Sequence, residues 1–226
     1  MQRILAVVLI LLMSLSKSGI PMEQPVTKRL DVIERRYSRE GVSEFLAIVG
    51  DIRGDGLLSG ADFSQETCYN VTPERVARET DIRIFKYSKT GLSLALVDGE
   101  VYPICEWFGG WGFMDAISWD FDQDGLTDLL VLSSWGSGLH RDEISVFNRR
   151  TKESKVIAEV FDEEYIHNGL FDLCFDDGPY EVDGVLNINV YEANDMVERD
   201  DYVRYTKAGL HGTIKMVDGQ PVYIRK

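Results

Sequence analysis

The chain has 226 residues, of which 44% are hydrophobic, 11% aromatic and 27% charged. That length allows one large domain or two small ones, and the apolar and aromatic content excludes disorder over most of the chain. The formal net charge of −14 has the sign opposite to that of a general nucleic-acid-binding protein. Nucleic acid is therefore excluded as a partner, and the open question is whether the acidic residues are spread out or clustered.

Residues 1–18 have the pattern of a secretory signal peptide. Arg3 precedes an unbroken apolar run at 4–13, which is shorter than the roughly 20 apolar residues that a membrane-spanning helix needs. Ser16 and Ser18 provide a small-x-small cleavage site. We expect an exported protein, periplasmic or secreted, that contacts a membrane only if this signal stays uncleaved.

The signal is followed by an expected tether and one expected domain. Residues 19–29 contain two prolines and no hydrophobic periodicity. No linker-like stretch interrupts 42–226, so we interpret residues 30–226 as a single β-rich domain.

Two short helices are predicted within this domain. Apolar residues recur at i, i+3 and i+7 from Leu30, which predicts a helix over 30–40 that ends at Gly41. A second helix is predicted after Thr72, because the next residue is a proline and this pair is typical of an N-cap and a first helical position.

Most of the remaining sequence alternates between apolar and polar residues in the manner of β-strands. The dipeptide Asp98-Gly99 is typical of a tight hairpin turn between two of these strands. The pattern predicts a mainly β protein, a single compact antiparallel β domain of small propeller-like or sandwich-like architecture. The predicted strands are 82–87, 92–97, 100–104, 113–119, 129–133, 144–148, 155–161, 185–191, 213–217 and 222–225.

The most specific motif in the sequence is a run of alternating aspartates followed by Gly125. The glycine permits a sharp turn, which would bring hard oxygen ligands together in the number that Ca²⁺ prefers. The twelfth position is Val131, inside an apolar run, so the loop leads into a strand rather than a helix. A solvated acidic turn is the alternative. The predicted calcium ligands are Asp120, Asp122, Asp124, Leu126 and Asp128.

This segment resembles a known family. Residues 119–131 read Trp-Asp-Phe-Asp-Gln-Asp-Gly-Leu-Thr-Asp-Leu-Leu-Val and are similar to the calcium loop and following strand of FG-GAP/VCBS-type repeats. Residues 47–56 look like a degraded second copy in which Arg53 replaces a ligand, so metal binding by the Asp51–Asp62 loop is left open. In architecture, a small exported domain with one such loop also resembles bacterial periplasmic lysozyme inhibitors and immunity proteins.

The acidic residues are concentrated in residues 160–201. This segment holds thirteen Asp and Glu residues and a single arginine, a density that would steer a basic protein partner toward it. We assign Asp176 and Asp177 as possible partner-binding residues. The alternative is a solvated face that only keeps the protein soluble.

All four tryptophans lie between residues 107 and 135. Trp107 and Trp111 stand among glycines, and we predict an aromatic surface there for a protein or a glycan. Core packing is the alternative for both, and it is the expectation for Trp119.

The cysteine content and the absence of catalytic motifs limit the functions that the sequence supports. Cys68, Cys105 and Cys174 allow one disulfide in an oxidising compartment, and the sequence does not choose among the pairings. No nucleophile-elbow or zinc-helix motif is present, so no catalytic residue is assigned. We expect a calcium-binding, protein-binding domain that acts as an inhibitor or immunity protein against a cell-wall hydrolase. A carbohydrate-binding or adhesive module and a carboxylate-dependent hydrolase are the alternatives.

Overall fold

The computed structural model describes residues 31–52, 64–87, 92–105, 109–136, 140–160, 172–176, 178–199 and 201–226. Over these residues the chain forms antiparallel β-sheets and two short helices, which confirms the predicted fold class. None of the described helices is long and apolar enough to span a bilayer. The predicted signal peptide and tether lie outside the described residues.

The first sheet is a four-stranded antiparallel meander. Asp98 and Gly99 have φ values of 54° and 83°, so the hairpin between its last two strands closes with the tight turn that this dipeptide predicts. The shortest strand of the sheet was not predicted, because three residues are too few to show a period. The strands pair in the order β2 (Cys68–Asn70), β3 (Arg83–Tyr87), β4 (Ser93–Val97) and β5 (Glu100–Cys105).

The second sheet is another four-stranded meander, and its first two strands are buried on both faces. Leu129 and Val131 pack toward the first sheet, whereas Leu130 and Leu132 pack toward the third. This double burial explains why the sequence of β7 is a continuous apolar run rather than an alternation. The strands are β6 (Gly112–Trp119), β7 (Asp128–Trp135), β8 (Arg141–Asn148) and β9 (Glu153–Val160).

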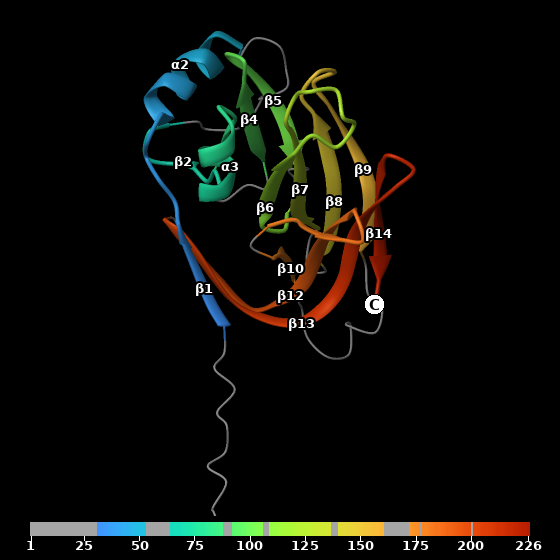
Figure 1. Ribbon diagram of the computed structural model, residues 1–226. Coiled ribbons are helices and arrows are strands. Elements are labelled where there is room, and N and C mark those ends of the chain that lie inside the picture. Colours follow the sequence, from blue (N-terminus) through green and yellow to red (C-terminus); the bar gives the residue numbers. More distant parts are fainter. Residues whose placement is uncertain are drawn as a thin grey trace, which may run out of the picture.

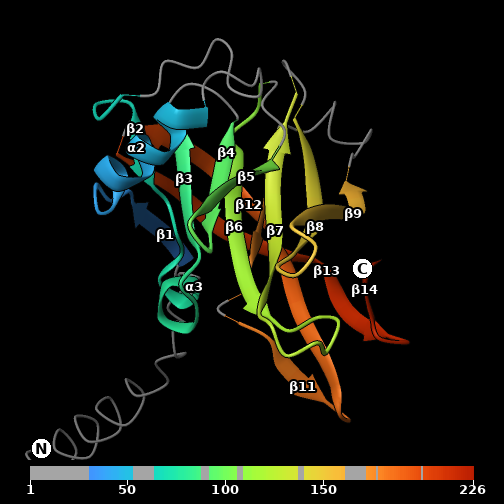
Figure 2. The ribbon, with the colours of Figure 1, turned by 90° about the horizontal axis from the view of Figure 1, so that it is seen from above.

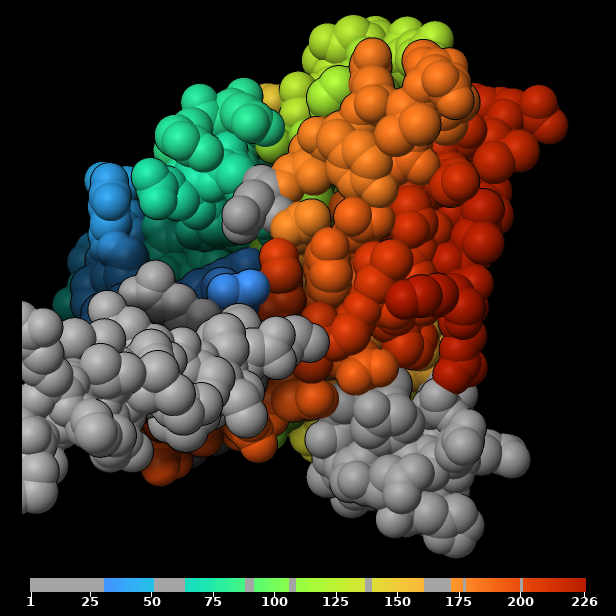
Figure 3. Space-filling model, turned by 60° about the horizontal axis from the view of Figure 1, so that its bottom comes forward, coloured from blue at the N-terminus to red at the C-terminus, as the bar shows by residue number. Residues whose placement is uncertain are grey.

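The third sheet is built on two long strands, which Figure 1 shows as a curved ribbon beneath the other sheets. Register shifts interrupt the pairing of these strands between Val190 and Val197, and such bulges bend a ribbon. Figure 3 shows that these C-terminal residues form much of one face of the molecule. The sheet contains β1 (Asp31–Arg36), β13 (Tyr202–Val217), β12 (Val185–Arg199) and β10 (Asp172–Phe175), with β11 (Tyr180–Val182) on β12 and β14 (Gln220–Arg225) on β13.

Two helices complete the layers (Figure 2). Helix α2 (Val42–Ile52) covers the outer face of the first sheet, where Phe45 stacks on Phe85 with ring centroids 4.0 Å apart. Helix α3 (Glu74–Glu79) buries Val76 in the core between the first two sheets. The helix lies where it was predicted but begins one residue later, because Pro73 rather than Thr72 takes the N-cap position and Glu74 is the first helical residue.

The predicted helix over 30–40 is wrong, because residues 31–36 form strand β1 and pair antiparallel with β13. The side chains that turn inward are Ile33 and Arg35, two residues apart. A charged residue at an inward position concealed this alternation in the sequence. Gly41, with a φ of 73°, precedes helix α2 instead of ending a helix.

The expected disulfide is also wrong, because all three cysteines are free and buried. Cys68, Cys105 and Cys174 belong to three different hydrophobic clusters, and a disulfide needs Cα atoms within about 7 Å. Burial raises the pKa of the Cys68 and Cys174 thiols to about 12. These thiols are protonated at neutral pH and behave as small apolar groups.

One buried carboxylate joins three elements of the fold. Asp115 on β6 is fully buried, and Arg35 from β1 reaches its two oxygens at 2.6 and 2.9 Å. Arg75 from α3 approaches the same carboxylate at 2.5 Å. Burial alone would raise the pKa of Asp115, but the charges of the two arginines outweigh it and lower the pKa. Asp115 is therefore ionised and holds β1 and α3 against the second sheet, which is the central one of the three.

We predict that Asp115→Asn destabilises the protein by about 3–5 kcal/mol, because it leaves two partly buried guanidinium groups without their counter-ion. Urea unfolding followed by circular dichroism measures the change. The matched control is Asp201→Asn, since Asp201 is exposed and its only ion pair among the described residues is 3.7 Å long. The control is expected to cost less than about 1 kcal/mol, and equal losses in the two variants would contradict the prediction.

Candidate metal site and neighbouring groove

The loop between β6 and β7 brings three carboxylates together. Asp120, Asp122 and Asp124 each offer an oxygen that lies within 4.8 Å of the others. Gly125 has a φ of 87°, and no other group lies within 4 Å of the position of a Cβ atom. The turn is therefore made by backbone conformation, as the motif predicts, and the three carboxylates form a cluster that could bind a metal ion.

The backbone of the loop wraps around these carboxylates. The amide of Asp124 donates to Asp120 Oδ1 at 3.0 Å and to Asp122 Oδ1 at 3.1 Å. The Gly125 amide donates to Asp120 Oδ2 at 2.9 Å, and the Leu126 amide donates to Asp124 Oδ1 at 2.8 Å. Such side-chain-to-backbone bonds fix a turn, so the oxygens are held together by the chain itself.

Two residues near the end of β8 contact the cluster from outside. Asn148 Nδ2 donates to Asp122 Oδ2 at 2.7 Å, and Arg150 pairs with the Asp124 carboxylate. The bond from Arg150 lowers the pKa of Asp124. Sequence reasoning missed both residues, because they follow the motif by more than twenty positions. Among the described residues one guanidinium faces three carboxylates, so the cluster keeps an excess of negative charge.

Asp128 plays a different part from the other aspartates. Its side chain is 1% exposed, and its oxygens accept hydrogen bonds from the Phe121 amide at 3.3 Å and the Arg149 amide at 2.8 Å. Burial, with the charges of Asp122 and Asp124, raises its pKa. Asp128 lies outside the three-carboxylate group, and its role as a ligand, like that of the Leu126 carbonyl, stays a prediction.

A groove of about 760 Å³ adjoins the loop. Asp122 and Asp128 line it beside residues of β8, β9 and β14, and Figure 1 shows β9 and β14 next to one another. Val156 and Val222 are 45% and 41% exposed along its walls. The groove thus combines an apolar surface with two carboxylates of the candidate metal loop. Its apolar lining residues are Phe121, Val146, Val156, Ile157, Pro221 and Val222.

The assigned aromatic residues do not form an open surface among the described residues. Trp111 is half-buried, and its indole N–H donates to Asp172 Oδ2 at 2.7 Å. Trp107 lies outside the described residues. Trp119 was expected in the core but is 38% exposed, because it is the last residue of β6 before the loop.

The acidic segment receives counter-charges from other parts of the chain. Asp176 pairs with Lys207 at 2.8 Å, and Glu198 pairs with Lys86. Both lysines lie outside residues 160–201, so the count along the sequence overstates the charge of the surface. Asp177 lies outside the described residues, as do residues 161–171.

Two buried aspartates form a second polar cluster that the sequence did not reveal. Asp172 Oδ1 accepts from Ser134 Oγ at 2.8 Å and lies 3.4 Å from His140 Nδ1. Asp142, fully buried, has no hydrogen-bond partner for Oδ1 among the described residues. Burial, and then the charge of Asp172, raises the pKa of Asp142 well above 3.8. The aspartates are thirty residues apart, on β8 and β10, so no local pattern joins them.

Comparisons with family profiles, curated protein sequences and solved structures give no match to this chain. The resemblance of the loop to FG-GAP/VCBS-type repeats, and of the architecture to lysozyme inhibitors, therefore stays a prediction. The segment before the Asp51–Asp62 loop is helix α2, whereas a strand precedes the 120–128 loop. Residues 53–62 themselves lie outside the described residues.

We predict that the stability of the Asp142→Asn variant, measured relative to the parent protein, increases as the pH rises from 4 to 8. The folded pKa of Asp142 is raised above 3.8, so its favourable contribution is present when it is protonated and is lost as the pH rises. Melting temperatures of the variant and the parent protein across this range measure the difference.

The control variant is Asp98→Asn, and its stability relative to the parent protein is expected to change with pH in a way that has the opposite physical cause. The pKa of Asp98 is lowered to about 2 by its bonds to Arg149 and Lys152, so its contribution is present above pH 3.8 and is lost as the pH falls. Asp98→Asn should therefore cost stability at neutral pH, and this cost should shrink in acid. A pH-independent difference between Asp142→Asn and the parent protein would contradict the assignment.

Proposed function

We propose that this protein is an exported, calcium-binding β domain that binds a protein partner. The observation that carries the proposal is the convergence of three carboxylates within 4.8 Å on a loop whose amides hold them in place. Like charges this close repel one another, and a bound cation would relieve the repulsion. Arg150 is their only guanidinium partner within the described part of the chain, so most of their negative charge is left for a cation to neutralise.

Calcium fits the donor set better than magnesium does. Ca²⁺ accepts six to eight oxygens in flexible geometry, whereas Mg²⁺ requires a strict octahedron and retains water. The Asp120, Asp122 and Asp124 carboxylates would hold the ion, with Leu126 and Asp128 as the further predicted ligands. When bound, the ion supplies the positive charge that keeps the loop in one conformation.

The groove beside the loop is the proposed contact surface for the partner. Asp122 and Asp128 belong to both the loop and the groove wall, so an ion in the loop would fix one wall. Exposed Val156 and Val222 offer an apolar contact. Glu153 and Lys155 on the groove wall offset one another, so the acidic contribution comes from Asp122 and Asp128. This combination fits a partner that presents an apolar side chain flanked by basic residues.

A basic cell-wall hydrolase is the partner class that we propose, with this protein as its inhibitor or immunity protein. The net charge of −14 supports attraction to such an enzyme, as do Glu181 and Asp183, which stay exposed at the β11–β12 hairpin. A periplasmic or secreted location belongs to the same proposal. The carbohydrate-binding and hydrolase alternatives stay predictions.

We predict that Ca²⁺ raises the melting temperature and that EDTA reverses the effect. Binding to the folded state alone stabilises it by about 2.7 kcal/mol when free Ca²⁺ is 100 times its dissociation constant. Asp122→Ala removes one of the three clustered carboxylates and should abolish the response. Differential scanning calorimetry and a Ca²⁺ titration by isothermal calorimetry measure the two quantities.

The matched control is Asp201→Ala, which removes an exposed carboxylate far along the sequence from the loop. This variant should keep the full response to Ca²⁺. The calcium assignment fails if the parent protein shows neither binding heat nor a thermal shift. It also fails if both variants respond as the parent protein does.

We further predict that the protein binds a basic lysozyme at low salt in the presence of Ca²⁺. Val156→Asp should weaken this binding by at least tenfold, because it places an unpaired charge in the apolar groove. Val32→Asp is the control, since Val32 is 55% exposed on β1 and does not line the groove. Biolayer interferometry measures the affinities, and no binding at low salt would overturn the proposed partner class.

A further inference from the structure

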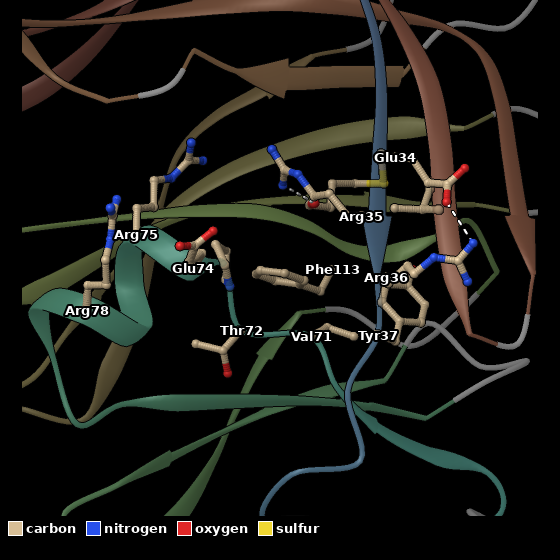
Figure 4. Close-up of a pocket in the computed structure, with 13 residues that line it drawn as sticks. Glu34, Arg35, Arg36, Tyr37, Val71, Thr72, Glu74, Arg75, Arg78 and Phe113 are labelled. Carbon is tan, nitrogen blue, oxygen red and sulfur yellow. Dashed lines mark hydrogen bonds and ion pairs between the residues drawn. The ribbon is translucent and has the colours of Figure 1, made fainter.

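A second cavity, of about 650 Å³, lies between strand β1 and helix α3. Figure 4 shows Arg35 pointing from β1 toward Arg75 and Arg78 on α3, with Phe113 between the two elements, whereas Arg36 points away toward Glu34 at the edge of the cavity. Glu34 and Glu74 are its only acidic lining residues among those described. A cavity with four arginines among its lining residues is an exception in a protein with a net charge of −14.

The two inner arginines of the cavity, Arg35 and Arg75, contact Asp115 and provide a fixed positive charge. Arg35 and Arg75 share the single carboxylate of Asp115, so the three groups together carry one excess positive charge. Arg75 is held further by bonds from Nε to the Ala116 carbonyl at 2.8 Å and from Nη1 to the Asp176 carbonyl at 2.9 Å. Because these side chains cannot turn away, the wall they form is preorganised for an anion.

The two outer arginines, Arg36 and Arg78, differ in whether their guanidinium groups are already paired. Arg36 pairs with Glu34 at 3.0 Å and more loosely with Asp201 at 3.7 Å. Arg78 is exposed at the mouth of the cavity, and within the described part of the chain it has no hydrogen-bond or ion-pair partner. The guanidinium group of Arg78 is therefore the one that can contact a ligand directly.

The remaining wall of the cavity is apolar. Val71, Phe113, Met114 and Val203 line it, and all four are at most 9% exposed. Ligand pockets typically combine a mainly apolar lining with a few convergent polar groups, and a volume of 300–1,000 Å³ is usual for them. Here the charged lining groups are four arginines and two glutamates, so cations are in excess, and the ligand that complements both surfaces is an amphipathic anion.

We propose that this cavity binds a small organic anion, in which an apolar group carries a carboxylate or a phosphate. Arg78 contacts the anionic oxygens, while Arg35 and Arg75 supply the positive field behind them. The apolar group lies against Phe113 and Met114. This site is separate from the calcium loop and the groove, so it stands or falls independently of the proposed partner.

The proposal is tested with phenyl phosphate and benzoate as probes, by isothermal calorimetry and by chemical-shift changes in ¹H–¹⁵N spectra. Saturable binding of either probe is expected, with shifted signals at β1 and α3, and raised NaCl should weaken it. The probe that binds identifies the anionic group, and binding of both identifies an oxyanion of either kind. Arg78→Gln should weaken binding by about tenfold, through loss of a charge-assisted hydrogen bond. Arg141→Gln is the control, because Arg141 is exposed on β8 outside the cavity.

Two further probes separate the contributions of the two walls. Inorganic phosphate should bind more weakly than phenyl phosphate, and neutral benzyl alcohol should not bind measurably. The proposal is overturned if no anion binds saturably, if Arg78→Gln and Arg141→Gln bind equally well, or if benzyl alcohol binds as tightly as benzoate. Circular dichroism of the Arg78 variant checks its fold, and folding is expected because this side chain is exposed and unpaired in the described structure.

Discussion

The ion triad at Asp115 is the interaction on which the arrangement of the described residues depends most. Removing a carboxylate from water costs several kcal/mol unless opposite charges and hydrogen-bond donors replace the water. Arg35, Arg75 and the Ala116 amide at 2.9 Å do so here. Because each guanidinium comes from a different element, satisfying one buried charge fixes the third sheet and helix α3 relative to the central sheet. The arginine-lined cavity is a consequence of the same pairing.

The central sheet explains why the candidate metal loop is well placed for binding. Strands β6 and β7 are packed on both faces by apolar side chains, so the two ends of the loop are held rigidly. The aspartates then need only local hydrogen bonds to converge. A site built between rigid strands presents its ligands with little loss of conformational entropy. The adjoining groove is lined by Asp122 of this cluster and by Asp128, so the loop and the groove form one continuous surface.

Charge counted along the chain gave an incomplete description of the surface. The segment 160–201 is strongly acidic in sequence, but Lys207 and Lys86 approach two of its carboxylates from other strands. The opposite case is the basic cavity, where arginines from β1 and α3 gather within an acidic protein. Arg75 and Arg78 are three residues apart on one helix, a spacing that places them on one face. That spacing was a local signal for half of this site.

Features that depend on short stretches of chain were predictable from the sequence. The Asp98-Gly99 hairpin, the helix after Pro73, most strands and the convergence of Asp120, Asp122 and Asp124 follow from preferences that act within about ten residues. Tertiary structure decided the rest. Residues 31–36 form a strand because they pair with β13, and this places Arg35 at Asp115, eighty positions away in the sequence. Asp142 lies near Asp172 because β8 and β10 pack together. Whether a charged side chain is buried depends on the partner that the fold brings to it, and no local pattern contains that partner.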